Sequence, residues 1–255
     1  MNTLRRENRV EHLTSAEVAD AVANGSRTAI LPLAAVEQHG AHLPLSMDAD
    51  HADELAVRVA QGLGGALVLP TVRVGYSPHH LAFPGTLSLR ASTLEAICED
   101  YGSNLVRSGF ERLLIFSGHI GNYPVMREFE LRLARKLAPL SVIVFTDSSA
   151  ILEAWRQAAE DVASLGRNVG GHADVAETSV MLALAPDRVR VGHLDRGFMG
   201  PVDDELLAHV FSEGLDSVAP NGVLGDPAGA SPSIGRACLE AVTSLIVEHA
   251  RTRGA

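Results

Sequence analysis

The chain has 255 residues, of which 46% are hydrophobic and 20% charged, and its formal net charge is -10 at pH 7. This length and apolar content predict a single well-filled domain over residues 1-255 and exclude a disordered or fibrous chain. The negative charge, without a long basic run, argues against nucleic acid or an anionic membrane surface as a partner. We therefore expect a small-molecule substrate and further copies of the chain as its partners.

Apolar, β-branched runs alternate along the chain with stretches of helical periodicity. The predicted strands are Ala29 to Val36, Ala66 to Val74, Arg112 to Phe116 and Leu140 to Thr146. The predicted helices are Ser15 to Ala23, Ala49 to Gly62, Ser92 to Ser108, Asn122 to Leu137, Ser148 to Leu165, Val175 to Ala183, Asp203 to Glu213 and Ser231 to Thr252. This alternation predicts βαβ units, and hence an α/β fold with a parallel sheet covered by helices on both faces.

Membrane and disulfide signals are missing from the sequence. No apolar run approaches the ~18 residues needed to span a bilayer, and the N-terminal residues are polar. The two cysteines, Cys98 and Cys238, lack the spacing of a thiolate metal site and do not indicate a disulfide framework. We expect a cytoplasmic enzyme.

A candidate half of a metal site follows the first predicted strand. Glu37 and His39 lie two residues apart, so on an extended strand end both side chains project to the same side. Gly40 lets the backbone bend away directly afterwards, and Asp48 can return from the start of the next helix. Taken alone, Glu37 and His39 also fit a solvated strand end.

A second candidate half follows the third predicted strand, where the chain reads Ser117-Gly118-His119-Ile120-Gly121-Asn122. Ligands of open α/β sheets bind beyond the carboxyl ends of the strands, and Glu37, His39 and His119 all fall at such ends. Oxygen and nitrogen ligands without a thiolate suit zinc, manganese or ferrous iron. The sequence therefore predicts a metal site at this edge of the sheet.

These motifs resemble those of the creatininase family of metal-dependent amidohydrolases, and the resemblance covers nearly the whole chain. The matching elements, in order, are Glu37-Gln38-His39-Gly40 with His42, Asp48, Phe83-Pro84-Gly85-Thr86, Gly118-His119 with Asn122, and Glu177-Thr178-Ser179 preceded by His172. The resemblance implies a three-layer αβα sandwich with a mostly parallel central sheet. It also implies two divalent metal ions per chain (zinc, manganese or iron) and a homo-oligomer, typically a hexamer.

The resemblance assigns roles to individual residues. It makes Glu37 and His119 ligands of one metal, His39 a ligand of the other, and Asp48 the carboxylate that bridges both. A hydroxide bridging the metals is then the nucleophile. His172 matches the family's catalytic histidine, which carries a proton from the water to the leaving nitrogen.

The chain departs from creatininase itself two residues after His119. Creatininase has a glutamate there as the last ligand of the second metal, whereas this chain has Gly121. Glu177 is our candidate for this last ligand of the second metal. It is also, like His172, a candidate catalytic residue. Glu177 lies five residues after His172, so a turn between them can bring the carboxylate and the imidazole to the entrance of the same site.

The substrate is less constrained by the sequence. Creatininase uses tryptophans around its ring substrate, whereas the only tryptophan here, Trp155, lies in a predicted helix, and Asn168 matches one of those positions. This disfavours creatinine. The segment Gly75 to His80 resembles family members that open formamides or cleave peptide-like amides.

Three residues are predicted to contact the substrate, namely Tyr76, His80 and Asn122. A polar imidazole at the rim suits a polar, hydrogen-bonding substrate, while the neighbouring His79 is expected to face solvent. His51 follows Asp48 by three residues on a predicted helix. It either orients that carboxylate or is simply a surface or packing residue.

Three functions remain open at this point. The leading one is hydrolysis of the C–N bond of a small cyclic amide, a formamide or a peptide-like amide. The second is hydrolysis of a cyclic ketone or lactone on the same metal site, because hydroxide attacks any polarised carbonyl. The third is a non-catalytic assembly module that keeps the fold.

Overall fold

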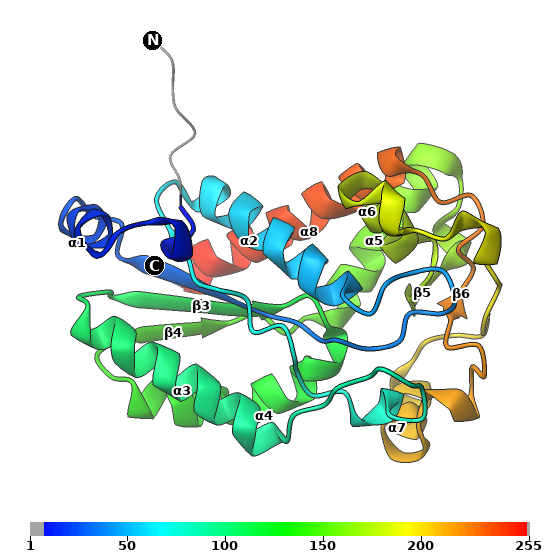
Figure 1. The fold of residues 1–255 in the computed structure, drawn as a ribbon, viewed down its shortest axis with the longest axis horizontal. Helices are drawn as coiled ribbons and strands as arrows, with labels where there is room; N and C mark the ends of the chain where they lie inside the picture. Colours follow the sequence, from blue (N-terminus) through cyan, green and yellow to red (C-terminus); the bar gives the residue numbers. More distant parts are fainter. Residues whose placement is uncertain (1–7, 254–255) are drawn as a thin grey trace, which may run out of the picture.

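A four-stranded parallel sheet forms the centre of the molecule, with the strands in the order β2-β1-β3-β4 (Figure 1). The strands are β1 (Thr28–Leu33), β2 (Leu67–Val68), β3 (Arg112–Ser117) and β4 (Ser141–Val144). The computed structural model describes residues 8–253. All residues of β1 and β3 after the first are buried, as expected for central strands that helices cover on both faces.

Helices cover both faces of this sheet (Figure 1). One layer contains α2 (Met47–Leu63), α5 (Ser148–Ala163), α6 (Val175–Leu184) and α8 (Pro232–Arg253), and the opposite layer contains α3 (Ala91–Arg107) and α4 (Tyr123–Lys136). The short α1 (Ser15–Ala23) lies at the left edge of Figure 1. The predicted α/β fold with three αβα layers is confirmed.

The second predicted strand, Ala66 to Val74, is much shorter in the structure. Only Leu67 and Val68 pair with β1, because Pro70 cannot donate a backbone hydrogen bond to a neighbouring strand. The chain meets β1 again at a single bridge between Val72 and Leu33. β1 also ends at Leu33, earlier than predicted, so the residues that follow are free to form a loop at the sheet edge.

A second, two-stranded sheet is absent from the predictions. It pairs β5 (Val169–His172) with β6 (Leu224–Gly225) in antiparallel fashion. A glycine-rich strand and a two-residue strand carry almost no hydrophobic periodicity, so neither gives a signal in the sequence.

Local capping explains some of the helix starts. Thr14 and Glu17 form a reciprocal capping box at α1, and the Asp147 carboxylate accepts a hydrogen bond from the Ala150 amide at α5. Asn122 precedes α4 but does not cap it, because its side chain bonds to the Ala34 carbonyl instead. α3 begins after Arg90 without a side-chain cap.

The apolar interior consists of a large core and a small satellite. The large core joins the parallel sheet to the helices on both faces. The satellite contains Val210, Leu215, Ala219 and Leu224, and it holds α7 (Asp204–Glu213) beside the 3₁₀ turn of residues 78–80. α7 therefore lies apart from the parallel sheet, at the lower right of Figure 1.

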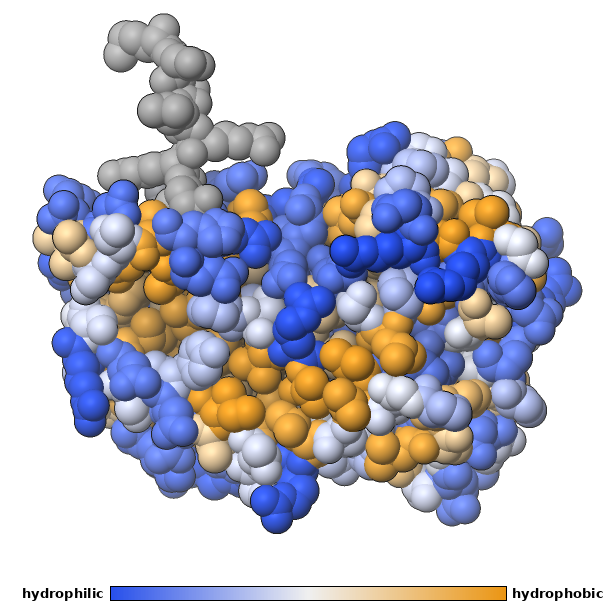
Figure 2. Space-filling view, in the orientation of Figure 1, coloured by the Kyte–Doolittle hydropathy of each residue, from blue (hydrophilic) through white to orange (hydrophobic). Residues whose placement is uncertain are grey.

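Apolar side chains are also exposed. Figure 2 shows them gathered across the lower centre of the viewed face. Leu45, Leu81 and Leu87 are large apolar residues with 37%, 55% and 53% of their surface exposed. Exposed apolar patches often mark interaction sites. No helix among residues 8–253 has the length and apolar content to cross a membrane.

Candidate metal centre

Five acidic and imidazole side chains meet at the carboxyl edge of the parallel sheet. Each is less than 5% exposed, and they come from the loops after β1 and β3, from the first turn of α2 and from α6. These residues are Glu37, His39, Asp48, His119 and Glu177. The structure thus brings together all five residues that the sequence proposed as metal ligands.

The first group consists of Glu37, Asp48 and His119. The Nδ1 atom of His119 lies 3.2 Å from Glu37 Oε1 and 3.3 Å from Asp48 Oδ2. The three ligand atoms lie within 4.8 Å of one another, which is a spacing that one metal ion can bridge.

The second group consists of His39, Asp48 and Glu177. The Nε2 atom of His39 lies 3.2 Å from Asp48 Oδ1 and 3.6 Å from Glu177 Oε2. Asp48 belongs to both groups and turns a different carboxylate oxygen toward each of them. The geometry is that of two neighbouring sites joined by one carboxylate.

Backbone carbonyls determine which imidazole nitrogen faces each group. His39 Nδ1 lies 3.2 Å from the Glu37 carbonyl oxygen, and His119 Nε2 lies 3.2 Å from the Tyr76 carbonyl oxygen. A carbonyl only accepts, so these two nitrogens carry the protons and donate. In the neutral imidazoles, His39 Nε2 and His119 Nδ1 therefore carry the lone pairs, and these are the atoms that face the carboxylates and are available to a cation.

This arrangement fits a bound cation. Glu37 Oε1, His39 Nε2 and Asp48 Oδ2 are buried without a hydrogen-bond partner among the described residues. Burial lowers the pKa of His39, but the carboxylates of Asp48 and Glu177 outweigh it and raise that pKa to about 10. Burial raises the pKa of Glu177 to about 8. Divalent cations would satisfy the unpartnered atoms and compensate the buried carboxylates.

Gly121 explains why the last ligand comes from α6. A Cβ atom at this position would collide with the His119 imidazole and would lie 2.7 Å from His79 Cε1. The loop after β3 therefore has no room for a glutamate while His119 holds its observed orientation. The Glu177 carboxylate lies instead on the side of the cluster that faces His39.

A tight turn between β5 and α6 positions both His172 and Glu177. Ala173, between them, has a positive φ of 53°, which is uncommon for a residue other than glycine. Its amide donates a hydrogen bond of 2.6 Å to Glu177 Oε2. The buried Asp174 carboxylate accepts from the amides of Gly170, Gly171, Ala176 and Glu177. These contacts hold the His172 imidazole and the Glu177 carboxylate next to the same cluster.

His172 adjoins the two groups that share Asp48, and together with Glu37 and His39 it forms a third buried group whose ligand atoms lie within 4.8 Å of one another. Its Nε2 atom is 2.9 Å from both the backbone oxygen and the side-chain nitrogen of Gln38. The backbone oxygen only accepts, which assigns the proton to Nε2 and the lone pair to Nδ1, while the Gln38 amide has other acceptors. Nδ1 lies 3.9 Å from Glu37 Oε1. Burial and the nearby His39 lower the pKa of His172 well below its usual value. The imidazole is therefore neutral at pH 7 and able to accept a proton.

Two residues that orient this centre, Ser77 and Gln38, were not predicted from the sequence. The Ser77 hydroxyl donates to Glu37 Oε2 over 2.5 Å, which leaves Oε1 for the cluster. The Gln38 side-chain amide donates to His80 Nδ1 and to the Gly222 carbonyl. Gln38 stands within the first motif, which is a signal that could have found it, whereas a serine in a loop carries none.

Of the three predicted substrate contacts, only His80 lines the cavity at the cluster. Its Nε2 atom lies 3.4 Å from Glu37 Oε1. Tyr76 and Asn122 are not among the described residues that line this cavity. The Asn122 side-chain amide donates to the Ala34 carbonyl and accepts from the Tyr76 backbone amide. It therefore joins the segments that contain these two residues and does not face the cavity.

Two further histidines, His79 and His51, are buried. His79 is only 6% exposed and packs against Phe211, with ring centroids 4.5 Å apart, so the prediction that it faces solvent is wrong. His51 is buried, and neither of its nitrogens has a hydrogen-bond partner among the described residues. It therefore does not orient Asp48 through a direct hydrogen bond.

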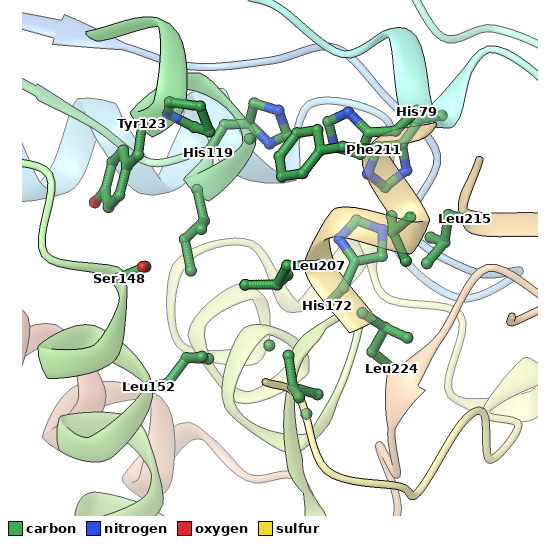
Figure 3. Close-up of a pocket in the computed structure, with 18 of the residues that line it drawn as sticks. His79, His119, Tyr123, Ser148, Leu152, His172, Leu207, Phe211, Leu215 and Leu224 are labelled. Atoms are coloured by element: carbon green, nitrogen blue, oxygen red, sulfur yellow. The ribbon is translucent and has the colours of Figure 1, made fainter. Parts of the chain in front are cut away.

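A cavity of about 210 Å³ opens onto the cluster (Figure 3). Its polar side contains Asp48, His80, His119, His172 and Glu177. The remaining lining is mostly apolar and includes side chains of α7. The centre is thus reachable by a small molecule and shielded from bulk water.

Residues 11–250 match the family model named creatininase and described as creatinine amidohydrolase. A mycofactocin precursor peptide peptidase from Mycolicibacterium smegmatis is 31% identical over 211 residues, covering 81% of this chain and 77% of the relative. A creatinine amidohydrolase from Pseudomonas putida is 35% identical over 195 residues, covering 71% and 73% respectively. A solved manganese form of creatininase has a TM-score of 0.76 at 29% identity and covers 97% of this chain and 98% of that chain.

Proposed function

This chain belongs to the creatininase family, and we propose that it is a metal-dependent hydrolase that cleaves the C–N bond of a small cyclic amide, a formamide or a peptide-like amide. The observation that carries this proposal is the pair of buried ligand groups that share Asp48. The two relatives described above support it, because one is named an amidohydrolase and the other a peptide peptidase.

The ligand groups suggest how two divalent ions would be held. Glu37 and His119 would bind one, His39 and Glu177 the other, and the Asp48 carboxylate would bridge both. The oxygen and nitrogen donors suit zinc, manganese or iron. Two such ions lower the pKa of a shared water toward ~7 and polarise a substrate carbonyl.

His172 is the proposed proton carrier. Its neutral Nδ1 is oriented by the Gln38 carbonyl and lies near Glu37, where an attacking water would be activated. The imidazole would take a proton from that water and give it to the nitrogen that leaves as the C–N bond breaks. His80 presents Nε2–H toward the same place and would donate to the substrate.

Metal analysis and a substrate panel test the proposal together. We expect about two divalent ions per chain after purification without chelator, and hydrolysis of at least one cyclic amide, formamide or peptide-like amide. Turnover restricted to lactones or cyclic ketones would favour the alternative chemistry on the same centre. Fewer than about one ion per chain, with no turnover, would indicate a non-catalytic assembly module.

Assembly into a homo-oligomer, most simply a hexamer, is also proposed. The exposed Leu45, Leu81 and Leu87 support it, because large exposed apolar residues are commonly covered in an assembly. Light scattering at micromolar concentration measures the mass directly. A stable species near 27.0 kDa would contradict self-association.

A further inference from the structure

The cavity beside the metal centre has a lining of two chemical kinds. The imidazoles and carboxylates described above form one part of it. Apolar side chains form another part, namely Leu152 of α5, Leu224 of β6 and three residues of α7. In Figure 3, Phe211 lies next to His119 and His79, and Leu207 and Leu224 lie next to His172, so apolar side chains border the polar ones directly.

The periodicity of α7 produces much of this apolar part. Leu207, Val210 and Phe211 lie three and four residues apart, so they share one face of the helix. All three line the cavity. We refer to Leu152, Leu207, Val210, Phe211 and Leu224 as the apolar wall.

Folding alone does not account for the whole wall. Val210 and Leu224 are buried in the satellite cluster, which holds α7 in place. Leu207 and Phe211 remain partly exposed although both are large and apolar. Apolar surface left in contact with water at a cavity is costly, and covering it with an apolar group is favourable.

The size of the cavity limits what can cover this surface. Its volume of about 210 Å³ corresponds to roughly seven water molecules at ~30 Å³ each. This is enough for an amide group and one side chain of about the size of leucine. A small polar ring would leave Leu207 and Phe211 uncovered.

We propose that the apolar wall binds an apolar side chain of the amide substrate, next to the bond that is cleaved, and that it selects the substrate. This inference rests on the proposed function and makes it narrower. The substrate is then a peptide-like amide with a bulky apolar side chain, rather than a formamide or a small polar ring.

Paired amides test the selection. N-acetyl-leucine amide and N-acetyl-serine amide are compared as substrates of the metal-loaded protein, and their binding is measured separately by calorimetry. We expect kcat/KM and affinity to favour the leucine compound by about 10- to 100-fold, the usual effect of burying one such side chain. The Leu207→Asn variant should reduce this ratio at least fivefold, roughly the effect of one to two methylene groups.

Glu205→Gln is the matched control, because Glu205 is exposed on the same helix and does not line the cavity. It should keep the wild-type ratio. Equal hydrolysis and equal binding of the two amides would overturn the wall assignment while the hydrolase function stands. Tighter binding of the leucine compound without hydrolysis of any amide would support the wall and count against the proposed function.

Discussion

The metal centre and the apolar wall line one cavity, but they are built in different ways. The centre is assembled from segments anchored in the large core, and backbone carbonyls orient its imidazoles. Most of the wall comes from α7, which a small satellite cluster holds beside the fold. On the proposed function, the reaction would depend on segments anchored in the large core, while the choice of substrate would depend on a helix held by the satellite cluster.

The largest effect is expected for Asp48→Ala. One carboxylate faces both ligand groups, so its loss should remove metal from both sites and abolish activity. Plasma emission analysis measures the metal content. Asp50→Ala is the control, because Asp50 lies on the same helix but pairs with Arg73 and Arg188. Unchanged occupancy in the Asp48 variant would remove this residue from the ligand set.

Glu177→Gln should affect only one side of the centre. The variant is expected to lose about one metal per chain, because His39 and Asp48 alone make a weak ligand set. Glu37→Gln should weaken the other site. An anomalous-scattering map with both metals present and the Glu177 carboxylate more than about 4 Å from each would contradict the assignment. Glu177 would then orient neighbouring groups instead.

His172→Ala should keep its metals but lose about 10²- to 10⁴-fold in turnover, the usual contribution of a positioned acid or base. The KM should change less than kcat. Because the neutral imidazole is the active form, the wild-type rate should fall at low pH. The pH–rate profile of the variant should lack this acidic limb. Wild-type turnover in the variant would demote His172 to a structural role.

The smallest of these effects is expected for Ser77→Ala. Ser77 orients Glu37 without belonging to either ligand group, and loss of such a partner typically weakens metal binding by ~10- to 100-fold. Chelator competition measures the affinity, with Ser103→Ala on the exposed surface of α3 as the control. Neither variant should change the preference between the leucine and serine amides. A changed preference would show that the centre and the wall are coupled.

The sequence predicts most of the fold because buried parallel strands have a strong apolar signature. β1, β3 and β4 all fall within or close to their predicted ranges. The β5–β6 pair escaped prediction because its glycines and its two-residue partner contain no periodic pattern. Its register depends on contacts between distant segments.

The site is predictable only where its residues share a local motif or a family resemblance. Glu37, His39 and His119 stand directly after apolar runs, whereas Ser77 joins the site through a contact with a residue 40 positions away. The apolar face of α7 is visible as periodicity, but periodicity does not distinguish a face that meets the core from one that meets a cavity. Leu207 and Phe211 therefore needed the three-dimensional arrangement.

The missing side chain at Gly121 has a consequence for any redesign of this centre. A single Gly121→Glu substitution would not supply a ligand here, because its Cβ atom would collide with the His119 ring and would lie 2.7 Å from His79 Cε1. Both rings would have to move before a carboxylate at residue 121 could reach the cluster, so moving the ligand from α6 to this loop requires several changes at once.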